Sequence, residues 1–122
     1  MTDRRAIPAD VHETSFYSNY ALIALGLCDG RPRFTFVIRA QVLDLLEDKL
    51  TEGDRQYMRR KRNGDVVPTT ESYPGTKWER WQDRFNDALY NLVDDGLITN
   101  DHVFALTDKG IKQLATLALS GV

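Results

Sequence analysis

The chain has 122 residues, which is enough for one domain with a single buried core. Its composition, 42% hydrophobic and 28% charged, is that of a soluble globular protein, and no apolar run is long enough to span a membrane. A single cysteine excludes an internal disulfide, and the N-terminus resembles neither a secretory signal nor a transit peptide, so we expect a cytoplasmic location.

The net charge is −2, but the basic residues are unevenly distributed along the chain. Five of them lie within eight positions that contain no acid: Arg55, Arg59, Arg60, Lys61 and Arg62. Without these five, 11 basic residues face 18 acidic ones, a balance of −7. An acidic body with one basic segment is typical of a surface that binds an anion locally, and a solvated, flexible loop is the alternative.

Residues 1–13 lack periodicity and are predicted to form a flexible arm. Thr14 or Ser15 can cap a helix that ends near the turn Asp29–Pro32. Its expected buried face consists of Phe16, Tyr20, Ile23, Ala24 and Leu27. These positions recur at helical spacing, so the first element is predicted to be an amphipathic helix.

The next segment, 34–37, is predicted to be either a brief strand or the entry to a second helix. Residues 38–50 follow a helical pattern, with the expected core positions Ile38, Val42, Leu45, Leu46 and Leu50. After this helix we expect a long basic, proline-containing loop at about residues 59–76. Because a loop of that length is unusual in a small domain, its presence favours a functional or disordered segment.

A third helix is predicted over residues 76–95, with Thr76 and Glu79 as a capping box and Gly96 as the terminating residue. Its apolar residues fall in one stripe: Trp78, Trp81, Phe85, Ala88, Leu89, Leu92 and Val93. Beside this stripe, one flank carries Lys77, Arg80, Arg84 and Asn91. The acids Glu79 and Asp83 lie further round the helix, and this separation of basic from acidic residues favours contact with an anion.

Two short strands, 97–99 and 103–106, are predicted to form a hairpin around residues 100–102. Thr107 can cap a last helix, whose apolar face is Ile111, Leu114, Ala115 and Leu117 or Ala118. The elements together predict one α+β domain, mostly helical, over residues 14–122.

The sequence from Ala88 to Ile98, followed by Phe104 to Gly110, resembles the end of a winged-helix domain. The whole layout, from about Ser15 to Leu117, is most similar to the N-terminal domain of Mrr-type restriction proteins, which carry a stretch similar to Leu50–Arg55 after the second helix. The resemblance implies a winged helix-turn-helix with a three-helix core, a β-hairpin wing and a C-terminal helix.

Two positions depart from that family. Asp87 stands where the family often has tryptophan, and Asp101–His102 replaces an arginine–glycine pair in the wing. The family's nuclease activity is not implied, because no nuclease domain follows in this sequence.

The resemblance and the basic flank together predict a protein that binds double-stranded DNA, with residues 76–95 in the major groove. The expected contact residues are Arg59, Arg60, Lys61, Arg62, Thr76, Lys77, Arg80, Arg84, Asn91 and His102. Such a domain would be a transcription regulator, or the reader of sequence or modification in a restriction or defence system. The alternative is a protein–protein adaptor on the same scaffold, which the overall acidity and the acids Glu79 and Asp83 favour.

No catalytic, metal or cofactor site is predicted. Glu47-Asp48-Lys49 imitates the acid-x-lysine triplet of metal-dependent nucleases, but adjacent residues on a helix diverge by about 100° and cannot serve one metal. His12, His102 and Cys28 lack zinc-site spacing. The expected partners are therefore DNA, a protein, or a second copy bound through the apolar segment 111–119.

Overall fold

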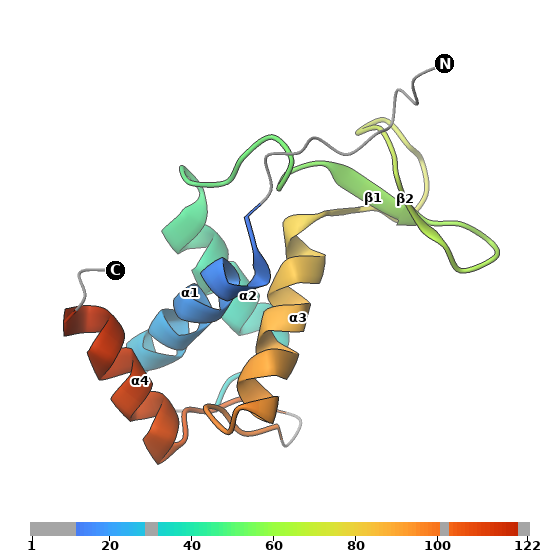
Figure 1. Ribbon diagram of the computed structural model, residues 1–122. Coiled ribbons are helices and arrows are strands. Elements are labelled where there is room, and N and C mark those ends of the chain that lie inside the picture. Colours follow the sequence, from blue (N-terminus) through green and yellow to red (C-terminus); the bar gives the residue numbers. More distant parts are fainter. Residues whose placement is uncertain (1–11, 29–31, 101–102, 120–122) are drawn as a thin grey trace.

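The computed structural model describes residues 12–28, 32–100 and 103–119 (Figure 1). Its helices are α1 (Thr14–Leu27), α2 (Thr35–Leu46), α3 (Trp81–Asp94) and α4 (Asp108–Leu119). Its strands are β1 (Tyr57–Arg60), β2 (Val66–Pro68) and β3 (Trp78–Glu79). The predicted α+β class is confirmed, and helices predominate. Residues 1–11 of the expected arm lie outside the described residues, whereas His12, near its end, is hydrogen-bonded to Asp54.

Helix α1 lies at the centre of the fold, in contact with α2, α3 and α4. Its buried side chains are Tyr17, Ala21, Leu22, Ala24 and Leu25. Of the predicted face, Ala24 is buried and Phe16 and Tyr20 pack partly buried against the core, whereas the assignment of Leu27 was wrong, because it is 59% exposed. Apolar residues occur all around this helix, and because three helices pack on it, the spacing of apolar residues does not single out one buried face.

Helix α2 begins directly after Phe34, so the segment 34–37 is the entry to the helix. Ile38, Val42 and Leu46 are buried as predicted, but the helix ends at Leu46 and not at residue 50. Just before it, Arg33 forms an antiparallel bridge with Phe104, in which each backbone N–H donates to the other residue's carbonyl oxygen at 2.9 and 2.8 Å. This bridge fixes the connection between α1 and α2 beside the segment that follows α3.

Helix α3 begins at Trp81, so the prediction that it starts at Thr76 was wrong. Residues 78–79 form β3, and the backbone N–H groups of Arg80 and Trp81 donate to the carbonyl oxygens of Gln56 and Asp54, each at 2.8 Å. These two carbonyls satisfy donors that a helix start leaves unpaired, so no cap at Thr76 is needed. From Trp81 onward the predicted stripe is buried, with its members Trp81, Phe85, Ala88, Leu89 and Leu92.

The end of α3 agrees with the sequence. Gly96 has φ of +75°, and the N–H groups of Gly96 and Leu97 donate to the carbonyls of Val93 and Leu92. This is the Schellman arrangement, which favours glycine. The hairpin predicted next is present only as a short antiparallel pairing, the bridge between Ile98 and Leu106.

Helix α4 is capped by Thr107 as predicted, because the Thr107 Oγ1 accepts the N–H of Gly110 at 3.1 Å. Of its predicted apolar face, Leu117 is buried and Leu114 packs against the core. The assignment of Ile111 and Ala115 to that face was wrong: both are exposed, Ile111 by 53%. The side of α4 that carries Leu114 and Leu117 faces the core, and Ile111 and Ala115 lie on other sides of the helix.

Candidate nucleic-acid interface

The basic segment forms a β-hairpin, so the prediction of a loop over 59–76 was wrong for its first half. Strand β1 pairs antiparallel with β2 on one edge and with β3 on the other, giving the order β2-β1-β3. The turn closes through the N–H of Gly64, which donates to the Lys61 carbonyl at 2.9 Å, and Gly64 has φ of +96°. Asn63-Gly64 is a strong local signal for such a turn, because glycine adopts the left-handed conformation without strain.

The tip of the hairpin points away from the helices (Figure 1). Arg60, Lys61 and Arg62 are exposed there. Within the described residues, no carboxylate forms an ion pair with any of the four residues Arg59–Arg62. The hairpin therefore presents positive charge that the rest of the described chain leaves unneutralised.

Aromatic rings hold part of this charge in place. The Arg59 guanidinium lies over the Tyr73 ring at 5.1 Å from its centroid, and the Lys77 Nζ lies 5.7 Å from the centroid of Tyr57. Lys77 also donates to the Tyr73 carbonyl at 3.0 Å. Tyr57 and Arg59 are two residues apart in β1, so their side chains lie on the same face of the sheet. That face carries cations beside rings, an arrangement suited to binding nucleic acid.

The other predicted DNA-contact residues do not all lie together in the structure. Thr76 is exposed on the loop before β3, and Lys77 joins the hairpin face. Arg80 precedes α3, Arg84 lies in its first turn, and both are only partly exposed. Asn91 is exposed near the other end of α3, apart from the hairpin. His102 lies outside the described residues.

A buried carboxylate anchors the base of the hairpin, and sequence reasoning missed it. Asp54 is 1% exposed. Its Oδ1 accepts the backbone N–H of His12 at 3.0 Å, while its Oδ2 accepts the N–H of Thr51 at 3.0 Å and lies 2.6 Å from the His12 Nδ1. Because the Asp54 carbonyl also accepts the N–H of Trp81, one residue joins the N-terminal segment, the turn before β1 and the start of α3.

The charges around Asp54 follow from burial and hydrogen bonds. Burial by itself raises the pKa of the Asp54 carboxyl, but the donors from Thr51 and His12 outweigh it and hold that pKa below the ordinary value. Burial, with the Asp54 charge, raises the pKa of Tyr17 far above its ordinary value. Burial and the neighbouring Arg84 lower the pKa of Arg80. Arg80 thus lies at the edge of this buried cluster, so the fold restricts its use as a surface cation.

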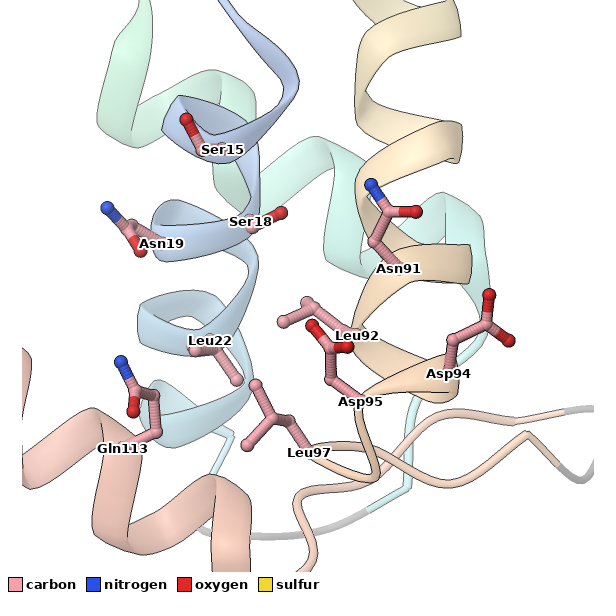
Figure 2. Close-up of a pocket in the computed structure, with 10 residues that line it drawn as sticks. All are labelled: Ser15, Ser18, Asn19, Leu22, Asn91, Leu92, Asp94, Asp95, Leu97 and Gln113. Carbon is pink, nitrogen blue, oxygen red and sulfur yellow. The ribbon is translucent and has the colours of Figure 1, made fainter.

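A cleft of about 430 Å³ lies between α1, the C-terminal half of α3 and α4 (Figure 2). Its lining consists of Ser15, Ser18, Asn19, Leu22, Asn91, Leu92, Asp94, Asp95, Leu97 and Gln113. The charged members are both acids, so this cleft does not suit a phosphate. Asn91 lines this cleft, whereas none of the basic residues with which the sequence grouped it does.

Among the residues with a described position, no three His, Cys, Asp or Glu side chains gather as a metal site would require, and no helix is long and apolar enough to cross a membrane. No protein-family model, curated protein or solved structure matches this chain. The functional assignment therefore rests on the geometry of the hairpin.

Proposed function

We propose that this chain binds double-stranded DNA, with the β1–β2 hairpin as its main contact. The observation that carries the proposal is the run of four consecutive cations, Arg59–Arg62, at the end of β1 and in the turn of a protruding hairpin, without carboxylate partners in the described residues. Duplex DNA presents one phosphate per about 1.7 Å of helix axis, so adjacent cations can each meet a phosphate. The acidic remainder of the chain would repel DNA elsewhere and so orient the hairpin toward it.

The order of elements supports a winged-helix fold for this function. Three helices precede the Ile98–Leu106 pairing, and the Arg33–Phe104 bridge adds the segment between α1 and α2. In such a fold α3 would be the recognition helix. Its most exposed residues are, however, Asp87, Tyr90, Asn91 and Asp94. Because two of these four carry negative charge, we assign the principal phosphate contacts to the hairpin and not to the outer face of α3.

The proposal predicts a specific loss on removing charge from the tip. Lys61→Ala/Arg62→Ala deletes two exposed cations whose side chains have no hydrogen-bond partner among the described residues. Affinity for a labelled random duplex, measured by fluorescence anisotropy, should fall at least roughly tenfold at about 0.15 M salt. The plot of log affinity against log salt should become shallower by about 1.8, or about 0.9 per lost phosphate contact.

Lys49→Ala/Lys112→Ala is the matched control. Both lysines are exposed and lie outside the hairpin, and each double variant takes the net charge from −2 to −4. If binding depends on the hairpin, this control should retain most of the affinity. Equal losses of duplex affinity in the two double variants would show a nonspecific effect of net charge. The absence of detectable binding by the unaltered protein at low salt would contradict the proposal.

Tyr73 allows the positioning of Arg59 to be tested without changing charge. Tyr73→Ala removes the ring beneath the guanidinium, a contact worth about 0.5–1 kcal/mol at an exposed site. We expect a loss of roughly twofold to fivefold in duplex affinity with an unchanged salt slope, and Tyr73→Phe should retain binding. A shallower slope in Tyr73→Ala would instead mean that phosphate contacts themselves are lost.

A protein–protein adaptor is the second candidate function, favoured by the acidic, partly aromatic outer face of α3. Asp87, Tyr90 and Asp94 are exposed there, Tyr90 by 64%. An interface with an apolar centre should tolerate salt, whereas binding through several phosphates weakens steeply with salt. The same salt titration therefore separates the two functions.

A further inference from the structure

Three large aromatic side chains are exposed together on the side of the molecule formed by α2 and α3. Phe34, Phe36 and Tyr90 are 54, 62 and 64% exposed, and we call them the aromatic patch. The rings of Phe34 and Phe36 stack, with centroids 5.8 Å apart and an angle of 9° between their planes. Aromatic side chains contribute most strongly to interfaces when buried, so their shared exposure marks a contact surface.

A cavity lies between Tyr90 and the start of α2. Thr35, between the two phenylalanines, lines a cavity of about 180 Å³ together with Asn86, Leu89, Tyr90 and Phe104. The cavity therefore joins the start of α2 to the outer face of α3. A ring from a partner could enter this hollow beside Tyr90.

Charge at the two sides of the patch is opposite in sign. On the α2 side, Arg33 precedes Phe34 and Arg39 lies one helical turn after Phe36. On the α3 side, the exposed Asp87 lies one turn before Tyr90. A twofold axis through the patch would set the basic side of one copy against the acidic side of the other, which is the self-complementarity that a symmetric dimer requires.

We propose that the aromatic patch is the centre of a symmetric contact between two copies of this chain. A large aromatic side chain buries about 150–250 Å² when fully covered. With more than half of each ring exposed, the three supply about 300–400 Å² per copy, somewhat less than half of the roughly 800 Å² that each partner contributes to a standard interface. The charged rim supplies the remainder, and the dimer should form in the micromolar range.

This contact is independent of the proposed DNA contact. The hairpin adjoins the N-terminal end of α3, whereas Tyr90 lies nine residues after Trp81, about 14 Å further along the helix. Self-association through the patch would leave both hairpins exposed. A failure of the dimer would thus leave the hairpin proposal intact, and the reverse also holds.

Sedimentation velocity of the full chain without DNA, over micromolar to several hundred micromolar concentrations, tests the proposal. We expect a monomer–dimer equilibrium, weakened at least tenfold by Phe36→Ser, whose exposed position should leave the thermal melt unchanged. Ile111→Ser is the matched control, because Ile111 is 53% exposed on α4, where the sequence placed a dimer contact. It should leave the dimer unchanged.

Charge exchange tests the twofold arrangement. Arg39→Glu and Asp87→Lys should each weaken the dimer severalfold, and the double variant should recover most of the loss because the pair is restored with reversed signs. A chain that is monomeric throughout the concentration range would overturn the proposal. So would a dimer lost in Ile111→Ser but retained in Phe36→Ser, which would place the contact on α4.

Discussion

Asp54→Ala should lower the free energy of unfolding by about 3 kcal/mol. The substitution removes the acceptor of two backbone N–H groups, those of His12 and Thr51, in a site where the carboxylate is 1% exposed. A buried donor left without a partner costs about 1–3 kcal/mol, so two donors account for a loss of this size even with partial rehydration. Urea unfolding followed by circular dichroism measures it.

Glu52→Ala is the matched control for this prediction. Glu52 is an exposed acid two residues away, and its removal should change stability by less than about 0.5 kcal/mol. The result would contradict the role assigned to Asp54 if the two alanine variants were equally stable. Because Asp54 also joins the turn before β1 to the start of α3, duplex binding should fall in Asp54→Ala as the hairpin loses its anchor.

The lowered pKa of Asp54 gives the same residue a pH dependence with a defined sign. The folded-state pKa lies below the unfolded value of about 3.9, so the stabilisation is complete above that value and is lost as pH falls toward the folded pKa. The stability difference between the unaltered protein and Asp54→Asn should therefore be constant near neutral pH and narrow below about pH 4. A difference that stayed constant down to pH 3 would contradict this.

Gly110→Ala is the second substitution with a large expected effect. It should destabilise the protein, although helix propensity by itself favours alanine over glycine. In the interior of a helix alanine is usually about 1 kcal/mol more favourable than glycine. At residue 110, however, a Cβ would lie 2.0 Å from the backbone carbonyl oxygen of Leu97. A backbone atom cannot rotate away as a side chain can, so α4 must shift, and we expect a loss of about 2–3 kcal/mol in stability.

Gly26→Ala separates this effect from crowding in general. A Cβ at Gly26 would lie 2.5 Å from the Leu114 Cδ2, the far end of a flexible side chain that can change rotamer. Its cost should be clearly smaller than that of Gly110→Ala in thermal unfolding. Equal or greater stability of Gly110→Ala relative to the unaltered protein would show that α4 does not sit as closely on the end of α3 as described.

Much of α3 and its surroundings could be predicted because the signals are local. The stripe from Trp81 to Leu92 follows the helical period, Gly96 supplies the left-handed conformation after the helix, and Thr107 caps the next one. The basic character of the hairpin was also evident from residue types alone. Its turn was encoded locally in Asn63-Gly64, but the little periodicity and the prolines of the segment predicted a loop instead.

The sequence by itself determined where helices could form and where positive charge is concentrated, because both depend on residues within a few positions of one another. Tertiary structure decided the start of α3, since the carbonyls of Asp54 and Gln56 that meet its first N–H groups come from more than 20 residues earlier. It also decided which face of α1 is buried and that Asp54 is enclosed. All three features depend on residues that are distant in the chain. The spacing of residues along the sequence does not indicate which distant group will accept a hydrogen bond from a given donor or cover a given side chain.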